Sequence, residues 1–254
     1  MKKKIYIYLI IIWTITLGVI IFSSVKTAKN YGPDIKNFVK TNIFDDDDFD
    51  FDEDYDDDND WSDTNSSSKK MIKEELDSFT KLDLDANIMR VTIRQGDSYK
   101  LECSYNKEKL RPDFKVVDGE LKIRQNIKKS NSGNNNCKLF LTLPRNAHLS
   151  EADIKVNVGE MIIENIEIDD LDAKTNVGNL SIVDTAFKEL DAETNVGELN
   201  IKTLNDLDEY DMDLKTDIGE LSVGDKELRH SYRQKGSENL KISARTNVGS
   251  LKIR

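Results

Sequence analysis

Apolar and polar residues alternate at period two through much of the second half of the chain, in units about twenty residues long. In one unit the residues expected to face inward are Leu171, Ala173, Thr175, Val177, Leu180 and Ile182. Such alternation is typical of strands with one buried face. The spacing widens between Val177 and Leu180, and a glycine lies in that break. Each unit is therefore predicted to be a strand, a corner and a second strand.

The corners share one pattern, an Asn or Asp followed by an aliphatic residue and Gly. Their members are Gly159, Gly178, Gly197, Gly219 and Gly249, with Asn157, Asn176, Asn195, Asp217 and Asn247. A sixth copy starts at Leu82 and has Met89 where the others have Gly. A repeat of this length indicates stacked units. We therefore expect positive φ at the glycines and a column of Asn amides that bond to each other or to the backbone.

Charged residues also recur at fixed places in the unit, facing outward. An acidic column contains Asp83, Asp153, Asp172, Asp191 and Asp213, and the column two residues further on contains Lys155, Lys174, Glu193, Lys215 and Arg245. Basic side chains beside acidic ones predict a solvated, cross-paired face. The alternative is that the Asp column binds calcium.

Two hairpin signals, at Gly96-Asp97 and Asp118-Gly119, separate the first copy from the second. The predicted fold is all-β, a β-solenoid of strand-corner-strand units with hairpin excursions, over residues 71–254. The last core position lies next to Arg254. The final strand is therefore expected to be an open edge through which copies of the chain, or another strand, could pair.

The amino terminus carries a targeting signal. Three lysines precede an apolar run, which predicts a cytoplasmic basic tail at residues 1–4 and a single transmembrane helix at 5–24. The expected location is the cell membrane, with the amino terminus cytoplasmic and the repeat domain extracytoplasmic.

Residues 25–70 are predicted to be a disordered acidic stalk. The formal net charge of the chain is −11, and residues 45–63 hold thirteen Asp and Glu without a Lys or Arg. Such a run repels itself and contains too little apolar surface to fold. The acidic segment is interpreted as a spacer. The alternative is that it binds divalent cations or a basic partner.

Reactive chemistry is sparse. His148 and His230 lie in no nucleophile or metal motif, and no phosphate-binding loop, cofactor motif or nucleic-acid surface is present. We expect a protein that is not an enzyme and needs no cofactor. Cys103 and Cys137 are either buried free thiols or, outside the cell, a pair. Interaction candidates lie in the longest interval between corners: Lys226, Arg229, His230, Arg233 and Lys235.

With LDLDANIMRVTI, DGELKI, LFLTLPRNAHL and the NVGEL units in view, the chain resembles the bacterial "putative adhesin" β-strand-repeat domains, also called toast-rack domains, over residues 76–254. It is most similar to the membrane-anchored LiaG-like proteins of cell-envelope stress operons. The resemblance implies a stack outside a bacterial membrane and supplies no catalytic residues.

The expected function is an extracytoplasmic interaction module with a protein partner in the envelope, accessory to envelope stress sensing. An adhesin-like binder of wall glycan or teichoic polymers is the alternative, and a β-helix polysaccharide lyase is a distant one.

Overall fold

The computed structural model describes residues 70–127 and 135–254. The predicted basic tail and transmembrane helix lie outside these residues, as does the predicted stalk apart from Lys70. The described residues are all-β, with thirteen strands in one continuous sheet. Two short 3-10 helices, η1 (Glu108–Leu110) and η2 (Leu207–Glu209), interrupt them. Within the described ranges, no helix has the length and apolarity to cross a membrane.

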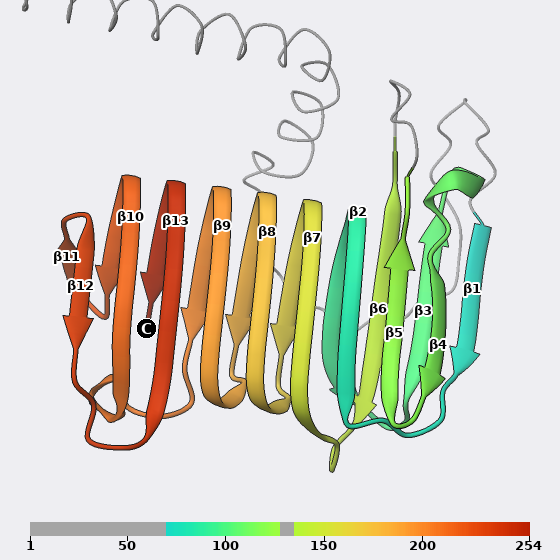
Figure 1. Ribbon diagram of the computed structural model, residues 1–254, viewed down its shortest axis with the longest axis horizontal. Coiled ribbons are helices and arrows are strands. Elements are labelled where there is room, and N and C mark those ends of the chain that lie inside the picture. The colour runs from blue at the N-terminus through green and yellow to red at the C-terminus, as the bar shows by residue number, and fades with distance from the viewer. Residues whose placement is uncertain (1–69, 128–134) are drawn as a thin grey trace, which may run out of the picture. The chain divides into compact units, whose positions relative to one another are not determined.

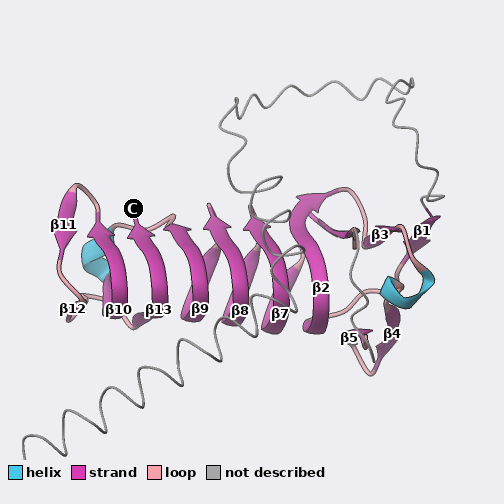
Figure 2. Cartoon of the chain, turned by 90° about the horizontal axis from the view of Figure 1, so that it is seen from above, coloured by secondary structure: helices cyan, strands magenta, loops and turns pink. Residues whose placement is uncertain are grey.

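Six long strands are the predicted repeat units: β2 (Lys81–Gly96), β7 (His148–Glu164), β8 (Glu167–Val183), β9 (Ala186–Lys202), β10 (Tyr210–Val223) and β13 (Leu240–Ile253). Each strand turns over at its corner, so its two halves lie in two facing layers (Figures 1 and 2). We call the halves before the corner the front layer and the halves after it the return layer. Neighbouring units pair in parallel and in register, as with Gly159 opposite Gly178.

Short strands close both ends of the stack. At the amino-terminal end, β1 (Lys70–Glu75), β3 (Lys100–Tyr105) and β6 (Cys137–Pro144) extend the return layer, while β4 (Asp113–Val117) and β5 (Glu120–Gln125) extend the front layer. At the other end, β11 (Lys226–Leu228) and β12 (Ser231–Gln234) each cover one half of β10. Short, charged edge strands protect a sheet from pairing with other chains.

One of the two predicted hairpins is confirmed. Asp118 and Gly119 both have positive φ, and they join the antiparallel strands β4 and β5. The hairpin predicted at Gly96-Asp97 is wrong, because β6 lies between β2 and β3 and pairs with both. The turn signal correctly marks where the chain reverses after β2. The strand beside the return half of β2, however, is β6 and not the next strand in sequence, β3.

The core between the layers follows the predicted alternation, except at one position. Leu171, Ala173, Thr175, Leu180 and Ile182 are buried, but Val177 is only partly so. The equivalent side chains on the later units, Val196, Val248 and Ile218, are 47%, 43% and 65% exposed. The expectation that this position faces inward is wrong, because it immediately precedes the corner glycine, where the strand turns over between the layers. These residues form an apolar column along the outside of the corner.

The corner requires glycine for two reasons. All five corner glycines have φ between +133° and +158°, a region that residues with a side chain rarely enter. In addition, a Cβ on Gly178 would lie 1.6 Å from the carbonyl oxygen of Gly159 on the neighbouring strand. Met89 is tolerated because it ends the column: β5 pairs with β2 only as far as Ala86, and β6 only from Arg90.

The order of the last units differs from the chain order. The strands run β9-β13-β10, so β13 is paired on both sides (Figure 1). The prediction that the final strand is an open edge is therefore wrong.

Charge explains why this order is favourable. If β9 and β10 were neighbours in the same register, Glu189 would face Asp211 and Asp191 would face Asp213. Like charges directly opposite each other destabilise a sheet. β13 places Lys241 between Glu189 and Asp211 and Ser243 between Asp191 and Asp213. Lys241 Nζ lies 3.5 Å from a carboxylate oxygen of Glu189.

Replacing Gly178 by Ala is expected to lower the free energy of unfolding by more than about 3 kcal/mol, because strained φ adds to overlap with a backbone carbonyl. Gly119→Ala is the control: its φ is also positive, but no atom lies within 4 Å of the added methyl group. Urea unfolding followed by circular dichroism measures both. Equal losses in the two variants would contradict the role assigned to the stacked carbonyl.

The variant Lys241→Glu is expected to lower the free energy of unfolding by about 1 kcal/mol, because it places a third carboxylate between Glu189 of β9 and Asp211 of β10. The matched control is Lys252→Glu on the same strand, whose neighbours are the uncharged Asn200 and Ser222. Thermal unfolding at low and high salt measures the effect. A loss in Lys241→Glu no greater than in the control would show that charge does not favour this strand order.

Candidate functional site

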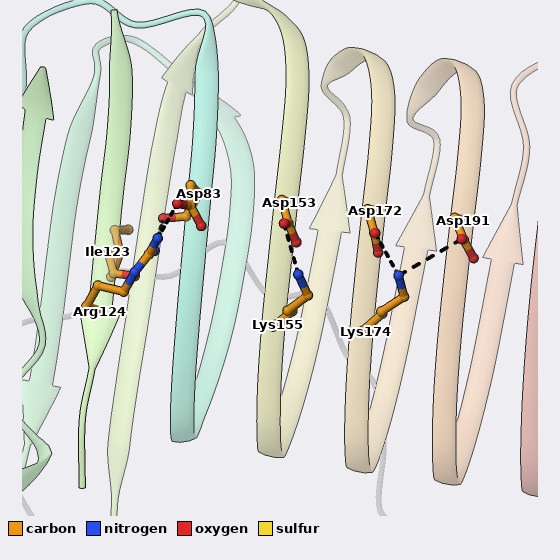
Figure 3. A network of polar contacts seen from close by, with 8 residues as sticks. All are labelled: Asp83, Ile123, Arg124, Asp153, Lys155, Asp172, Lys174 and Asp191. Atoms are coloured by element: carbon orange, nitrogen blue, oxygen red, sulfur yellow. Dashed lines mark hydrogen bonds and ion pairs between the residues drawn. The ribbon is translucent and has the colours of Figure 1, made fainter. Parts of the chain in front are cut away.

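The outer face of the front layer carries a ladder of ion pairs, drawn in Figure 3. Lys155 Nζ lies 3.0 Å from a carboxylate oxygen of Asp153, and Lys174 Nζ lies 2.7 Å from Asp172. Lys174 also reaches Asp191 on the next strand, at 4.0 Å. Outward residues two apart on a strand lie on one face, and in-register strands repeat them about every 4.8 Å. The predicted cross-paired face is confirmed at these residues.

At the amino-terminal end the ladder continues through an arginine that is not part of a repeat. Arg124 of β5 pairs with the carboxylate of Asp83 and donates a hydrogen bond to the Asp83 carbonyl oxygen at 2.9 Å. Bonding to Asp83 raises the pKa of Arg124, as bonding to Asp172 raises the pKa of Lys174. Sequence reasoning missed Arg124, because the parallel pairing of β5 with β2 is not visible in the repeat pattern.

Beside this ladder lies a shorter acidic column, one residue before the first core position. Glu151, Asp170 and Glu189 lie on consecutive strands. Lys81 pairs with Glu151 at 2.7 Å and Lys241 with Glu189, which leaves Asp170 between two other carboxylates. Partial burial, followed by repulsion from Glu189 and Glu151, raises the pKa of Asp170. Among the described residues, no group of three or more His, Cys, Asp or Glu is arranged to hold a metal ion.

The corner amides form a hydrogen-bonded ladder along the edge of the stack. Each Nδ2 donates to the Oδ1 of the preceding rung: Asn176 to Asn157 at 3.0 Å, and Asn195 to Asn176 and Asn247 to Asn195 both at 2.7 Å. Asp217 occupies the last rung and instead pairs with Lys215 at 2.6 Å, an interaction that lowers the pKa of Asp217. A carboxylate has no proton to donate, so the amide ladder does not extend to β10.

The five basic candidates lie in or beside the two strands that cap β10. Arg233 pairs with Asp213 at 3.1 Å, and Lys235 pairs with Asp211 at 2.6 Å, so both hold the cap to β10. Lys235 also lowers the pKa of Asp211. The side chains of Lys226, Arg229 and His230 are exposed, and no ion pair joins them to another residue within 70–127 or 135–254.

His148 lies close to two carboxylates that are distant from it in the sequence. Its Nδ1 lies 3.4 Å from Glu167 and its Nε2 3.2 Å from Asp169, both on the next strand. Lys188 contacts Asp169 at 2.9 Å and, with a smaller effect from His148, lowers the pKa of Asp169. Only the register of β7 with β8 brings these residues together.

A model of the family Toastrack DUF4097 matches residues 79–254. The chain belongs to the toastrack family. The predicted resemblance to the toast-rack domains is confirmed, and the family is one of unknown function. A search of curated proteins finds no match.

A solved structure described as a "putative cell adhesion protein" from Clostridium sporogenes shares this fold. It is 18% identical with a TM-score of 0.53, and the match covers 73% of this chain and 97% of that one. Another, a "putative adhesin" from Bacteroides fragilis, is 17% identical with a TM-score of 0.45, and the match covers 74% of this chain and 98% of that one. At such identities the first structure shows the fold alone.

Asp170→Asn is expected to stabilise the toastrack domain at pH 7 by less than about 1 kcal/mol, because the site is largely exposed. The raised pKa means that the folded state disfavours the charged carboxylate, so Asp170 destabilises the fold above that pKa. The gain should therefore vanish as the pH falls below about 4.

Asp172→Asn, two residues further along the same strand, is the matched control. It also removes a carboxylate, but one that is bonded to Lys174. Thermal unfolding between pH 3 and pH 7 measures both variants. A loss of stability at pH 7 in Asp170→Asn, equal to that in Asp172→Asn, would contradict the repulsion assigned to Asp170.

Proposed function

We propose that this toastrack domain is a non-catalytic interaction module, held outside the cell by a membrane anchor and accessory to the sensing or regulation of envelope stress. The anchor is inferred from the apolar run at residues 5–24 after three lysines. The observation that carries the interaction role is the cap at the end of the stack, where the exposed Lys226, Arg229 and His230 lie in and beside β11, which pairs with β10.

The five basic candidates differ in whether they form ion pairs, and the proposal assigns them two roles accordingly. Arg233 and Lys235 are engaged with Asp213 and Asp211, so they contribute to holding β12 in place. The other three are exposed basic side chains within five residues of the chain, and the exposed Asp225 and Glu227 lie beside them. Exposed basic side chains can pair with carboxylates of a partner, and attraction between opposite charges accelerates the encounter. The proposed partner is therefore an acidic surface of an envelope protein.

An adhesin-like role is the second candidate, because the same exposed basic side chains could also pair with an anionic wall polymer. The fold shared with the structure described as a "putative cell adhesion protein" agrees with this possibility. The two candidates differ in what binds: one predicts a specific membrane protein, and the other predicts retention by purified walls.

The test is cross-linking of intact cells that carry the tagged full chain, together with a binding assay on purified walls. The variant is Lys226→Ser, Arg229→Ser, His230→Ser. The matched control, Lys115→Ser, Lys252→Ser, Arg254→Ser, removes three exposed basic side chains elsewhere. A further variant lacking residues 45–63 reports on the acidic segment.

We expect one membrane protein to be captured by the full chain and by the control variant, and to be lost from the cap variant. Retention by walls alone, lost in the cap variant, would establish the adhesin-like role instead. Equal capture by all variants would show that the cap is not the contact. Protection of the domain from protease added to spheroplasts would contradict the proposed location.

A further inference from the structure

The two cysteines of the chain lie side by side in the return layer, close to the end where the described residues begin. Cys103 of β3 is opposite Leu139, and Cys137 of β6 is opposite Tyr105, so the cysteines are diagonal neighbours on the inward face. Their Sγ atoms are 3.8 Å apart. Both residues are buried, at 1% and 4% exposure.

We propose that Cys103 and Cys137 are a disulfide-forming pair that joins β3 to β6 when the chain folds in the presence of a disulfide oxidant. A disulfide bond is about 2.05 Å long, so each sulfur must move about 1 Å from its thiol position. β3 has only the six-residue edge strand β1 on its other side. A shift of this size therefore concerns the end of the stack and not the repeated units.

The reaction is a thiol–disulfide exchange with a small-molecule disulfide or an oxidoreductase. One of the two cysteines, exposed by local opening or during folding, attacks the oxidant's disulfide as a thiolate, forms a mixed disulfide and releases one thiol of the oxidant. The other cysteine then loses its proton, attacks the sulfur of the first and releases the second thiol. The pair loses two electrons and two protons, and the oxidant's disulfide is reduced to two thiols.

Burial decides when this exchange occurs. Ile72 of β1 lies opposite Cys103 and packs against the core, and Cys137 is bonded to the Leu110 carbonyl at 3.4 Å. An oxidant cannot reach either sulfur while this end of the domain is closed. The bond therefore forms during folding or after local opening, and once formed it resists reduction of the folded protein for the same reason.

The bond would close a loop of 34 residues that contains η1, β4 and β5. Closing such a loop stabilises a protein mainly by restricting the unfolded chain. For a domain of this size the thermal midpoint is expected to rise on the order of 10 °C.

The test uses the full chain, unfolded with reductant and refolded in buffers of increasing oxidised-to-reduced glutathione ratio. Free thiols are alkylated in denaturant, and mass spectrometry with peptide mapping identifies linked cysteines. Cys103→Ser and Cys137→Ser serve as controls that retain one thiol each. Thermal unfolding is compared with and without reductant.

We expect a monomer with linked Cys103 and Cys137 at oxidising ratios, a raised midpoint that reductant abolishes only after unfolding, and no redox dependence in either variant. Two alkylated cysteines at every ratio, or links only between chains, would overturn the proposal. Because the wild-type chain alone yields this result, poor folding of a Ser variant does not weaken the test. The outcome is also independent of the proposed function, since neither the anchor nor the cap is involved.

Discussion

The close approach of neighbouring strands at the corner glycines is the constraint on which the rest of the stack depends. Each glycine lies so near the carbonyl oxygen of the adjacent rung that an added Cβ would fall within 2 Å of it. The contact holds only when the units are in register, because a shift of one residue would bring a side chain into this space. In-register stacking then generates every column of the domain: core aliphatics, amides and alternating charges.

In-register stacking places like charges opposite each other on neighbouring strands, which destabilises a sheet. Two features of this domain reduce that repulsion. Within β7 and β8, a lysine two residues after the aspartate bonds back to it, which offsets repulsion between rungs. Between β9 and β10 a whole unit, β13, is inserted, and it places Lys241 between Glu189 and Asp211. The remaining exposed backbone edges belong to short strands rich in charge, which protects the ends from unspecific pairing.

The regular faces are largely occupied by internal contacts, so the specific features of this domain lie at its ends. One end carries the cap with its three exposed basic side chains, and the other carries the buried cysteine pair. The motifs that identify the fold are uninformative about a ligand, because they consist of residues that the stack itself requires.

The sequence by itself determined the strand–corner–strand unit, the inward residues on either side of the corner, the glycine column and the outward position of the Asp and Lys columns. These follow from period two and from the conformational demands of glycine, which are local properties. Only the tertiary structure decided that β13 lies between β9 and β10, that β6 separates β2 from β3, and that Val196, Val248 and Ile218 point outward. It alone brought Arg124 to Asp83 and Cys103 to Cys137. Periodicity reports which face of a strand is buried but not which strand is its neighbour, because pairing depends on charge and connections between residues far apart in the chain.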